Sequence, residues 1–183
     1  MKIEVKRVTS WERVLNACRM TVNKKYLEKE PDDEFKKKLI RAEHSPLRLL
    51  EFDVTFHDVP YWVHTELVRH HIGVEKFVTT SRPDRTGSKL TRHEMPQDAP
   101  VSMMFAINAQ SFINISKLRL CHQAAKETRE IWGEVIDALR EVEPLLADAC
   151  VPSCIYRGCC PEIKSCGFDE TRLFLAKLSE YQK

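Results

Sequence analysis

The sequence predicts an α+β protein with a short cysteine-rich tail. Segments with strand-like patterns lie at residues 1–8 and 50–59, far apart along the chain. A long amphipathic stretch at residues 124–142 carries apolar side chains at helical spacing. Five of the seven cysteines fall between Cys150 and Cys166. We therefore expect a segment over residues 150–183 that packs on the domain preceding it.

Composition indicates an ordinary globular chain. Its 183 residues are 43% hydrophobic and 31% charged, enough to bury a core. The net charge of +2 does not call for a nucleic-acid or membrane partner. No apolar run approaches the roughly 18 residues of a membrane span, and the N-terminus lacks a signal-peptide core. We expect a cytoplasmic protein whose cysteines are free thiols or metal ligands rather than disulfides.

Strand and helix signals alternate along the first part of the chain. Residues 1–8 alternate apolar and charged side chains, which predicts a strand. Thr9 or Ser10 can cap the helix that follows. Pro31 and the three acidic residues after it begin a second helix, expected to run to about residue 42. Residues 44–46 end that helix because Pro46 disfavours helical geometry before it.

The middle of the chain predicts a strand, a helix and a long loop. Residues 50–59 place Phe52, Val54 and Phe56 on one face of a strand. Pro60 begins a helix whose apolar residues extend to Ile72. Residues 79–100 are rich in Ser, Pro, Gly and charge, and so predict a loop; loops of this length are usually functional or disordered.

The last third of the chain is mostly helical in pattern. Residues 103–107 fit either a strand or the entry of a buried helix, and residues 108–120 predict a short helix. Residues 124–142 predict the clearest helix of the chain, with Ile131, Val135 and Leu139 on one stripe. Pro144 ends it.

The densest chemistry lies where the helix after Pro60 runs into the long loop. Arginines and histidines gather there in three runs: Arg69-His70-His71, Thr80-Ser81-Arg82 and Arg92-His93. Arginine forks match phosphate geometry, which favours an anion site. Glu66, Arg69 and His70 share one helix face by their spacing. A solvated basic loop beside a helix end explains the same composition, so composition alone leaves both interpretations open.

The order of these motifs resembles that of flavin-dependent thymidylate synthases. That family has an Arg-His-Arg signature followed by Ser-x-Arg. In this chain Arg69-His70-His71 stands in the place of the first motif and Thr80-Ser81-Arg82 in the place of the second. Further similar segments are His44-Ser45-Pro46, Arg92-His93-Glu94-Met95-Pro96, Asn108-Ala109-Gln110, Leu118-Arg119 and residues 124–129. The resemblance covers roughly residues 40–145. It implies the family's fold, a small mixed sheet packed by long helices, for a domain over residues 1–149.

The resemblance also implies two sets of binding residues. The flavin-contacting positions hold Ser45, Arg69, His70, His71, Asn108, Gln110 and Asn114. The positions that bind deoxyuridine monophosphate (dUMP) hold Glu66, Arg69, Thr80, Ser81, Arg82, Arg92 and Arg119. Arg82 and Arg92 would grip the phosphate, and Arg119, the catalytic residue, would stabilise negative charge on the N3–O4 edge of the pyrimidine. The structural alternatives are helix capping by the asparagines, turn capping by Ser45 and pairing of Arg119 with Glu127.

The family's reaction would make this chain a methyltransferase. NADPH reduces FAD, methylenetetrahydrofolate donates a methylene group to C5 of dUMP, and the reduced flavin supplies a hydride. In this family FAD lies at a subunit interface of a homotetramer.

This chain departs from the family at several positions of the implied site. His71 replaces an arginine and removes a fixed charge, and Glu66 replaces a glutamine with a carboxylate that repels anions. Residues 73–78 replace the family's Asn-Glu pair and add about one residue. The sequence therefore leaves open whether Thr80 or Ser81 matches the serine of the family's Ser-x-Arg motif. Action on another pyrimidine nucleotide, or binding without catalysis, is therefore the alternative.

The cysteine-rich tail has its own interpretation. Four thiolates can close a tetrahedral zinc site, although the spacing here is not the paired CxxC pattern. Cys154, Cys160 and Cys166 are the favoured ligands, with Cys150 or Cys121 as the fourth. Free thiols and a disulfide remain alternatives. The expected role is to pin the tail to the domain, which also keeps open a non-catalytic, zinc-stapled binding protein.

Overall fold

A four-stranded antiparallel sheet forms the centre of the molecule. A computed structural model describes residues 1–87, 89–91 and 93–182. The strands are β1 (Lys2–Arg7), β2 (Glu51–Pro60), β3 (Val74–Val78) and β4 (Pro100–Asn108), in the order β1-β2-β4-β3. All three pairings are antiparallel, so the prediction of a mixed sheet is wrong in this detail. The α+β class is confirmed.

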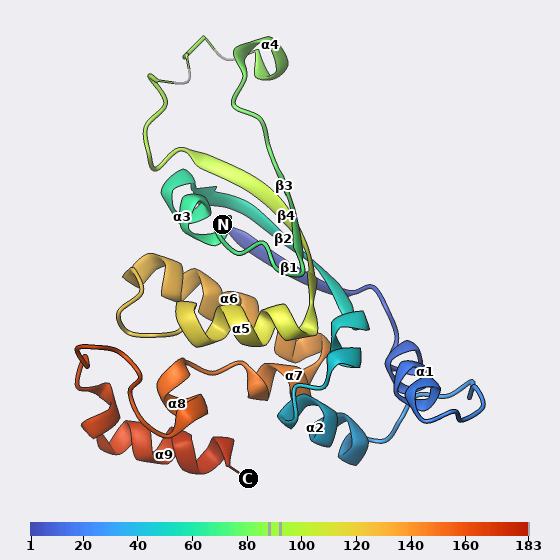
Figure 1. The fold of residues 1–183 in the computed structure, drawn as a ribbon. Coiled ribbons are helices and arrows are strands. Elements are labelled where there is room, and N and C mark those ends of the chain that lie inside the picture. Colours follow the sequence, from blue (N-terminus) through green and yellow to red (C-terminus); the bar gives the residue numbers. More distant parts are fainter. Residues whose placement is uncertain (88, 92, 183) are drawn as a thin grey trace.

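Helices flank the sheet and extend the molecule beyond it (Figure 1). They are α1 (Trp11–Thr21), α2 (Asp33–Arg41), α3 (Tyr61–Leu67), α4 (Pro83–Thr86), α5 (Ala109–Arg119), α6 (Lys126–Val142), α7 (Pro144–Ala149), α8 (Ser153–Arg157) and α9 (Arg172–Tyr181). Short 3₁₀ turns are η1 (Ser45–Leu49) and η2 (Phe168–Glu170). Among the described helices, none is both long and apolar enough to cross a membrane.

The core lies between the sheet and the helices below it. The rings of Phe52 in β2 and Phe112 in α5 pack edge to face, with their centroids 5.4 Å apart. The ring of Phe112 also packs against Trp132 of α6, with centroids 6.0 Å apart. The stripe predicted on α6 is confirmed, since Val135 and Leu139 are fully buried. A second, smaller cluster belongs to the C-terminal segment and consists of Cys154, Ile155, Phe168 and Phe174.

The predicted helix starts are mostly confirmed, with one difference in the first. Asp32 caps α2 by accepting a hydrogen bond from the Phe35 amide at 2.8 Å. Ser10 occupies the N-cap of α1 but makes no side-chain cap. The hydroxyl of Thr9 instead donates to the carbonyl of Leu49 at 2.7 Å and accepts from the amide of Glu51 at 2.8 Å. Thr9 therefore ties the end of β1 to the start of β2.

The helix after Pro60 is shorter than predicted. It ends at Leu67, and Ile72 is 85% exposed rather than on an apolar face. Gly73 follows with φ of +68°, a left-handed conformation that glycine adopts without strain. The chain then enters β3, which the sequence analysis missed, and β3 pairs with β4. Tertiary pairing overrides the helical pattern here.

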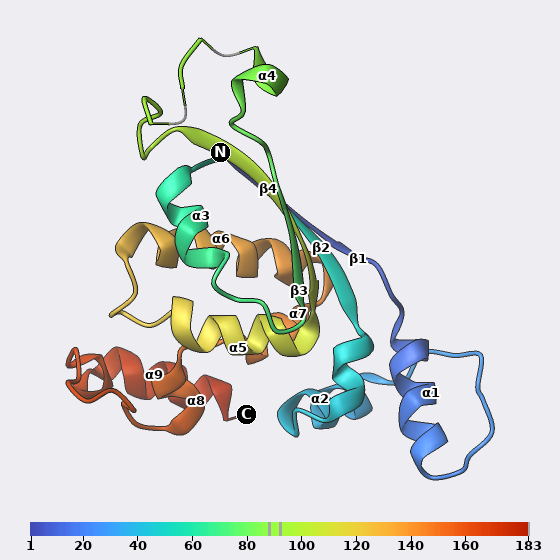
Figure 2. The same cartoon turned by 45° about the horizontal axis from the view of Figure 1, so that its top comes forward.

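The described residues of the predicted loop, 79–87, 89–91 and 93–99, form an arm that projects from the end of the sheet, while Pro100 already belongs to β4. Figure 2, with the top of the molecule brought forward, shows this arm and its single helical turn α4 extending away from α5 and α6. Residues 103–107, left open between strand and helix, belong to β4. Pro144 ends α6 as predicted, and it also begins α7.

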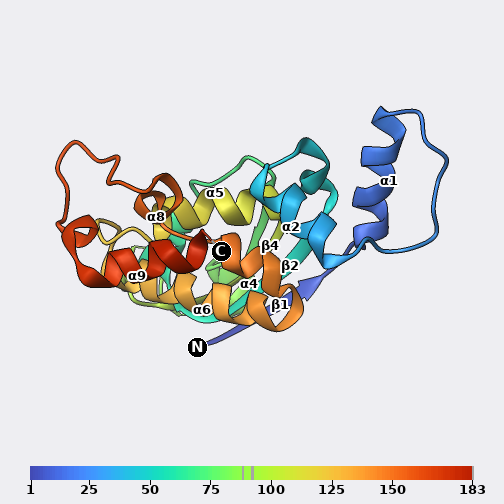
Figure 3. The same cartoon turned by 90° about the horizontal axis from the view of Figure 1, so that it is seen from below.

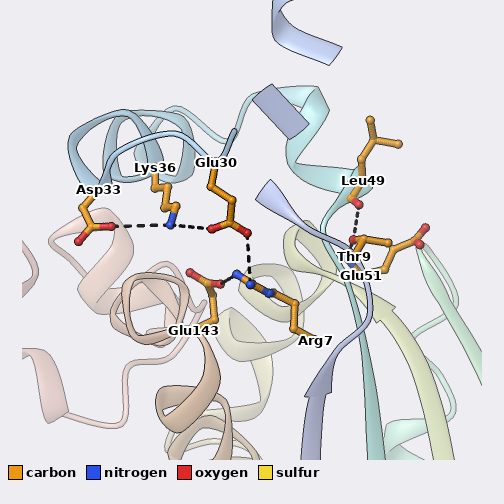
Figure 4. A network of polar contacts seen from close by, with 8 residues as sticks. All are labelled: Arg7, Thr9, Glu30, Asp33, Lys36, Leu49, Glu51 and Glu143. Atoms are coloured by element: carbon orange, nitrogen blue, oxygen red, sulfur yellow. Dashed lines mark hydrogen bonds and ion pairs between the residues drawn. The ribbon is translucent and has the colours of Figure 1, made fainter. Parts of the chain in front are cut away.

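A polar network joins β1 to the helices at the edge of the core (Figure 4). Arg7 donates to Glu143 at 3.1 Å and to Glu30 at 3.3 Å. Lys36 of α2 contacts Glu30 at 3.5 Å and Asp33 at 3.8 Å. The side chain of Glu143 is only 5% exposed, so its carboxylate depends on Arg7 for charge compensation.

Replacing Arg7 with methionine should therefore lower the free energy of unfolding by roughly 3 kcal/mol, because Glu143 keeps a buried and uncompensated charge. Urea unfolding at neutral pH measures the loss. Lys2→Met is the matched control, since the Lys2–Glu4 pair is 70% and 50% exposed and solvent screening should leave it with little effect on stability. Equal losses in the two variants would contradict a structural role for the Arg7–Glu143 pair.

Candidate functional site

The guanidinium of Arg119 is held by two groups far from it in the sequence. Arg119 stands in the last turn of α5, and its Nε donates to Nε2 of His70 at 2.9 Å. One terminal nitrogen donates to Oε2 of Glu66 at 3.1 Å, and the other donates to the Glu66 carbonyl at 2.7 Å. The Arg119 and Glu66 side chains are 15% and 24% exposed. A guanidinium has five N–H donors, so these contacts leave one on each terminal nitrogen.

His70 is neutral in this arrangement. Burial, and then the charges of Arg119 and Lys76 and the ring of His71, lower the pKa of His70 to about 4. Because Nε2 accepts from Arg119, the ring proton belongs on Nδ1. Burial also lowers the pKa of Arg119, partly offset by Glu66, yet arginine stays charged at neutral pH.

The cluster carries a surplus of positive charge. Arg69 is exposed in the turn after α3 and lies near enough to Arg119 to lower its pKa. Lys76 of β3 donates to the His70 carbonyl at 2.6 Å. Three cations, Arg69, Lys76 and Arg119, stand in this cluster. The acid that pairs with one of them is Glu66, which contacts Arg119. Such a surplus beside an anchored guanidinium suits an anionic ligand.

The lowered pKa of His70 makes stability depend on pH. An unfolded histidine titrates near 6.5, whereas folded His70 titrates near 4. Between these values the unfolded chain binds a proton that the folded chain does not, so the free energy of unfolding should fall as pH falls. His70→Gln keeps an acceptor for Arg119 without titrating, so it should flatten this slope in urea unfolding between about pH 7 and pH 4. An equally steep slope in the variant would contradict the assignment.

Three predicted flavin positions lie along α5, and each has a structural partner. Asn108 caps the helix, its Oδ1 accepting from the Ser111 amide at 2.9 Å and hydroxyl at 3.0 Å. Asn108 therefore caps the helix, as the structural alternative to flavin contact proposed. Because the cap uses Oδ1, the Nδ2 of Asn108 can still contact a ligand. Gln110 donates to Asn114 at 3.3 Å and also to Glu43.

Glu43 links this face of α5 to the turn before Ser45. Lys117 donates to Glu43 at 2.8 Å. Burial alone would raise the pKa of Glu43, but hydrogen bonds from Lys117, Tyr156 and Gln110 lower it below its usual value. The backbone of Glu43 has φ of 46°, a left-handed conformation that costs free energy in a non-glycine residue. Ser45 itself is exposed at the start of η1.

The predicted phosphate-binding residues lie elsewhere. Thr80, Ser81 and Arg82 are exposed on the arm beyond β3, away from α5 in the views of Figures 1 and 2. Arg82 pairs with Asp84 through two hydrogen bonds, at 3.0 and 2.7 Å. Arg92 lies outside the described residues. Within one chain, then, the structure brings Glu66, Arg69, His70 and Arg119 together and leaves Thr80, Ser81 and Arg82 apart.

Two charged residues of this region were not predicted from the sequence. Lys76 lies in the missed strand β3, where the alternation of Val74 with charged neighbours was the available signal. Glu43 directly precedes the His44-Ser45-Pro46 run, yet an acidic residue at the end of a helix carries no distinctive pattern.

The tail cysteines divide into two groups. Cys150 is 4% exposed in the main core, and burial raises its pKa to about 12. Cys154, Cys160 and Cys166 instead interact electrostatically with Cys121. Across residues 1–87, 89–91 and 93–182, no three His, Cys, Asp or Glu side chains are placed to hold a metal ion. The burial of Cys150 in the main core argues against this residue as a zinc ligand. The zinc site formed by the other cysteines stays a prediction.

Metal analysis of the purified protein can decide the question of the tail. If Cys121, Cys154, Cys160 and Cys166 close around zinc when it binds, the wild-type protein should carry about one zinc ion per chain. Cys160→Ser should lose that zinc, and Cys150→Ser should retain it. Equal zinc content in Cys160→Ser and the wild type would remove the metal site.

Sequence relatives point to a single family. A family model described as thymidylate synthase complementing protein (Thy1) matches residues 87–145. The flavin-dependent thymidylate synthase of Clostridium tetani (strain Massachusetts / E88) is 32% identical over 77 residues. That match covers 42% of this chain and 30% of the relative, so the chain matches about a third of the relative's length.

Solved structures share the fold at lower identity. The flavin-dependent thymidylate synthase ThyX of Helicobacter pylori, complexed with FAD and dUMP, matches with a TM-score of 0.69 and 17% identity. The match covers 82% of this chain and all of that one. A UMP/dUMP methylase, PolB of Streptomyces cacaoi, bound with 5-Br dUMP, matches with a TM-score of 0.62 and 13% identity, over 81% of this chain and 94% of that one. The matched segment, the curated relative and the shared fold make this chain similar to flavin-dependent thymidylate synthases.

Proposed function

We propose that this protein methylates C5 of dUMP to give dTMP, using methylenetetrahydrofolate as the carbon donor and NADPH as the reductant of FAD. The anchored guanidinium of Arg119 carries the proposal. It is fixed by Glu66 and His70 at the end of α5, beside the exposed charge of Arg69. A similar fold in Helicobacter pylori ThyX is complexed with FAD and dUMP, which supports the choice of ligands.

Arg119 would act on the pyrimidine through its unused N–H donors. Negative charge on the N3–O4 edge of a uracil ring raises the electron density at C5 and makes that carbon nucleophilic toward an electrophilic carbon. A donor already fixed in place stabilises that charge without a reorganisation cost at the moment of reaction. Glu66 and His70 would therefore serve as positioning residues, because they hold the guanidinium rather than touch the base.

The residues along α5 fit a flavin. Both N–H groups of Gln110 are donated to Glu43 and Asn114, so this pair offers a ligand the Gln110 carbonyl as acceptor and the Asn114 amide nitrogen as donor, and the edge of an isoalloxazine ring requires both. Exposed Ser45 and Arg69 offer a hydroxyl and a cation for the ribose and pyrophosphate. Neutral His70 and the substitution at His71 reduce the positive charge available to the phosphates. Bound FAD, once reduced by NADPH, would supply the hydride that completes the methyl group.

We further propose a homotetramer in which the arm of one subunit completes the site of another. Arg82 lies on a projecting arm, and its neighbours Thr80 and Ser81 are also exposed there. For these groups to meet dUMP beside Arg119, the arm must reach the partner subunit's Arg119. Mixing inactive Arg82→Ala and Arg119→Ala proteins and reassembling them should restore part of the activity, since some sites would then combine two intact residues. No restoration from assembled mixtures would count against a shared site.

Tritium release from C5-labelled dUMP tests the reaction itself. Release should require both methylenetetrahydrofolate and reduced FAD, and the protein should bind FAD with a flavin absorbance that NADPH bleaches. Protein that binds FAD and dUMP yet releases no tritium under any reducing condition would be a binding protein without turnover.

A different pyrimidine nucleotide is the second candidate substrate. Glu66, where the family has glutamine, presents a carboxylate that repels anions and can only accept hydrogen bonds. The similar fold of a UMP/dUMP methylase makes UMP the first alternative to assay. Faster release from labelled UMP than from labelled dUMP would favour it.

A further inference from the structure

A large cavity separates the two hydrophobic clusters of the molecule. Its volume is about 850 Å³. Ile40 and Ile113 of the main core line it on one side, and Ile155 and Phe168 of the C-terminal cluster line it on the other. Figure 3, viewed from below, shows α8 beside α5, α9 at the left and α2 on the other side of α5. Two apolar surfaces therefore face a common space instead of packing into one core.

This cavity is distinct from the cluster around Arg119. Among the described residues, its lining leaves out Glu66, Arg69, His70 and Arg119. Its volume lies within the roughly 300–1,000 Å³ of small-molecule sites, which favour boundaries between packed units.

Positive charge dominates the polar part of the lining. Lys37 and Arg41 come from α2, Arg129 from α6 and Lys177 from α9. Within the described parts of the chain, Lys37, Arg41 and Lys177 form no ion pair. Arg129 donates one hydrogen bond to the His122 carbonyl at 3.2 Å. These cations come from three separate helices; Lys37, Arg41 and Lys177 are exposed at the cavity lining, and Arg129 is half-buried.

The acidic residues of the lining compensate only part of this charge. Asp148 is paired with Arg140, which also lines the cavity. Glu43 is paired with Lys117 at 2.8 Å. Of the acids among the described lining residues, Glu180 is the one that forms no ion pair. The cavity therefore keeps a surplus of uncompensated cations.

The lining of the cavity includes a stacked aromatic pair. The rings of His122 and Phe168 stack at 4.5 Å with an angle of 29° between their planes. Burial, and then the charges of Arg129 and Lys177, lower the pKa of His122, so its ring is neutral at pH 7. A neutral aromatic surface flanked by two cations suits a ring that carries a negative group.

We propose that this cavity is a second ligand site, one that binds a small aromatic anion: a planar apolar ring bearing a carboxylate, sulfonate or phosphate. The apolar walls bury the ring, and Arg41, Arg129 and Lys177 compensate the charge. The site is formed jointly by the domain and the segment after residue 149, so ligand binding would also hold the two together.

Titration with 8-anilinonaphthalene-1-sulfonate, whose fluorescence rises in apolar surroundings, tests this site. Binding should saturate at about one probe per chain and should persist when FAD is added. Arg41→Glu and Lys177→Glu should each weaken it roughly tenfold, because a charge reversal replaces attraction with repulsion. Lys25→Glu makes the same charge change on the exposed loop after α1 and should leave binding unchanged.

Unsaturable binding, unchanged affinity in both cavity variants, or equal weakening in Lys25→Glu would overturn the proposal. Displacement of the probe by FAD would overturn it too, because the probe would then occupy the flavin site. Flavin binding and tritium release in the same variants are separate readouts. Failure of the second site therefore leaves the proposed reaction standing, and failure of the reaction leaves the second site standing.

Discussion

Arg119→Ala is expected to reduce tritium release from C5 of dUMP by at least about 10²-fold. The variant removes the anchored donors that would face the pyrimidine as negative charge develops. It also leaves the Glu66 carboxylate, 24% exposed, without its ion-pair partner. Stability should fall by roughly 1–3 kcal/mol for this reason, because an unpaired and partly buried charge is costly.

The loss of activity must be separated from the loss of stability. Arg13→Ala is the matched control, since Arg13 pairs with Glu51 on an exposed edge where the two side chains are 49% and 46% accessible. Arg119→Lys restores the charge without the fork and should recover stability more than activity. Retention of a tenth or more of the wild-type rate in folded Arg119→Ala would show that Arg119 does not act on the substrate.

Glu66→Gln supplies the complementary change. The amide oxygen can still accept from Arg119, while the negative charge disappears. An anionic nucleotide should then bind more tightly, so KM for dUMP should fall while the unfolding free energy changes by about 1 kcal/mol. An unchanged KM would place Glu66 out of electrostatic reach of the nucleotide.

Gly73→Ala is expected to destabilise the protein by roughly 3 kcal/mol or more. The backbone φ of +68° is unfavourable for alanine. A Cβ there would lie 2.2 Å from Nδ2 of Asn108 and 2.5 Å from Oγ of Ser111. The cap of α5 would have to move, which adds overpacking and a lost hydrogen bond to the backbone strain. Urea unfolding measures the total.

Gly87→Ala separates strain from crowding. Gly87 has the same φ of +68°, but a Cβ there meets no atom within 4 Å. It should cost only about 1 kcal/mol, the backbone penalty alone. Similar losses in the two variants would mean that the contact between Gly73 and the cap of α5 has no energetic importance. Because Asn108 is also a proposed flavin residue, Gly73→Ala should weaken FAD binding as well.

Much of the secondary structure could be predicted because its signals are local. The acidic start of α2, the alternation of Phe52 with Val54 and Phe56, and the stripe on α6 each depend on residues within a few positions of one another. Backbone geometry turns such spacings into buried faces whatever surrounds them. The strand β3 was missed because its short run is stabilised by pairing with β4 rather than by its own pattern.

The candidate site could be predicted only in outline. The resemblance put Glu66, Arg69 and Arg119 in the predicted dUMP-binding group and His70 in the flavin-binding group, and the structure brings these four together. From the sequence, Glu127 was a candidate partner of Arg119. The structure instead pairs Arg119 with Glu66 and His70, which lie 53 and 49 positions away along the chain. Arg82 belonged to the same predicted group, yet it lies on the arm, paired with Asp84.

By itself, the sequence determined the approximate extent of most helices and of strands β1 and β2, and which residue types could bind an anion. Only the tertiary structure decided which of those side chains meet, that Cys150 and Cys154 belong to different hydrophobic clusters, and that a cavity lies between these clusters. The physical reason is range. Helix and strand periodicity depends on neighbours within one or two turns, whereas contacts across 50 residues depend on how whole elements pack after the chain between them has closed.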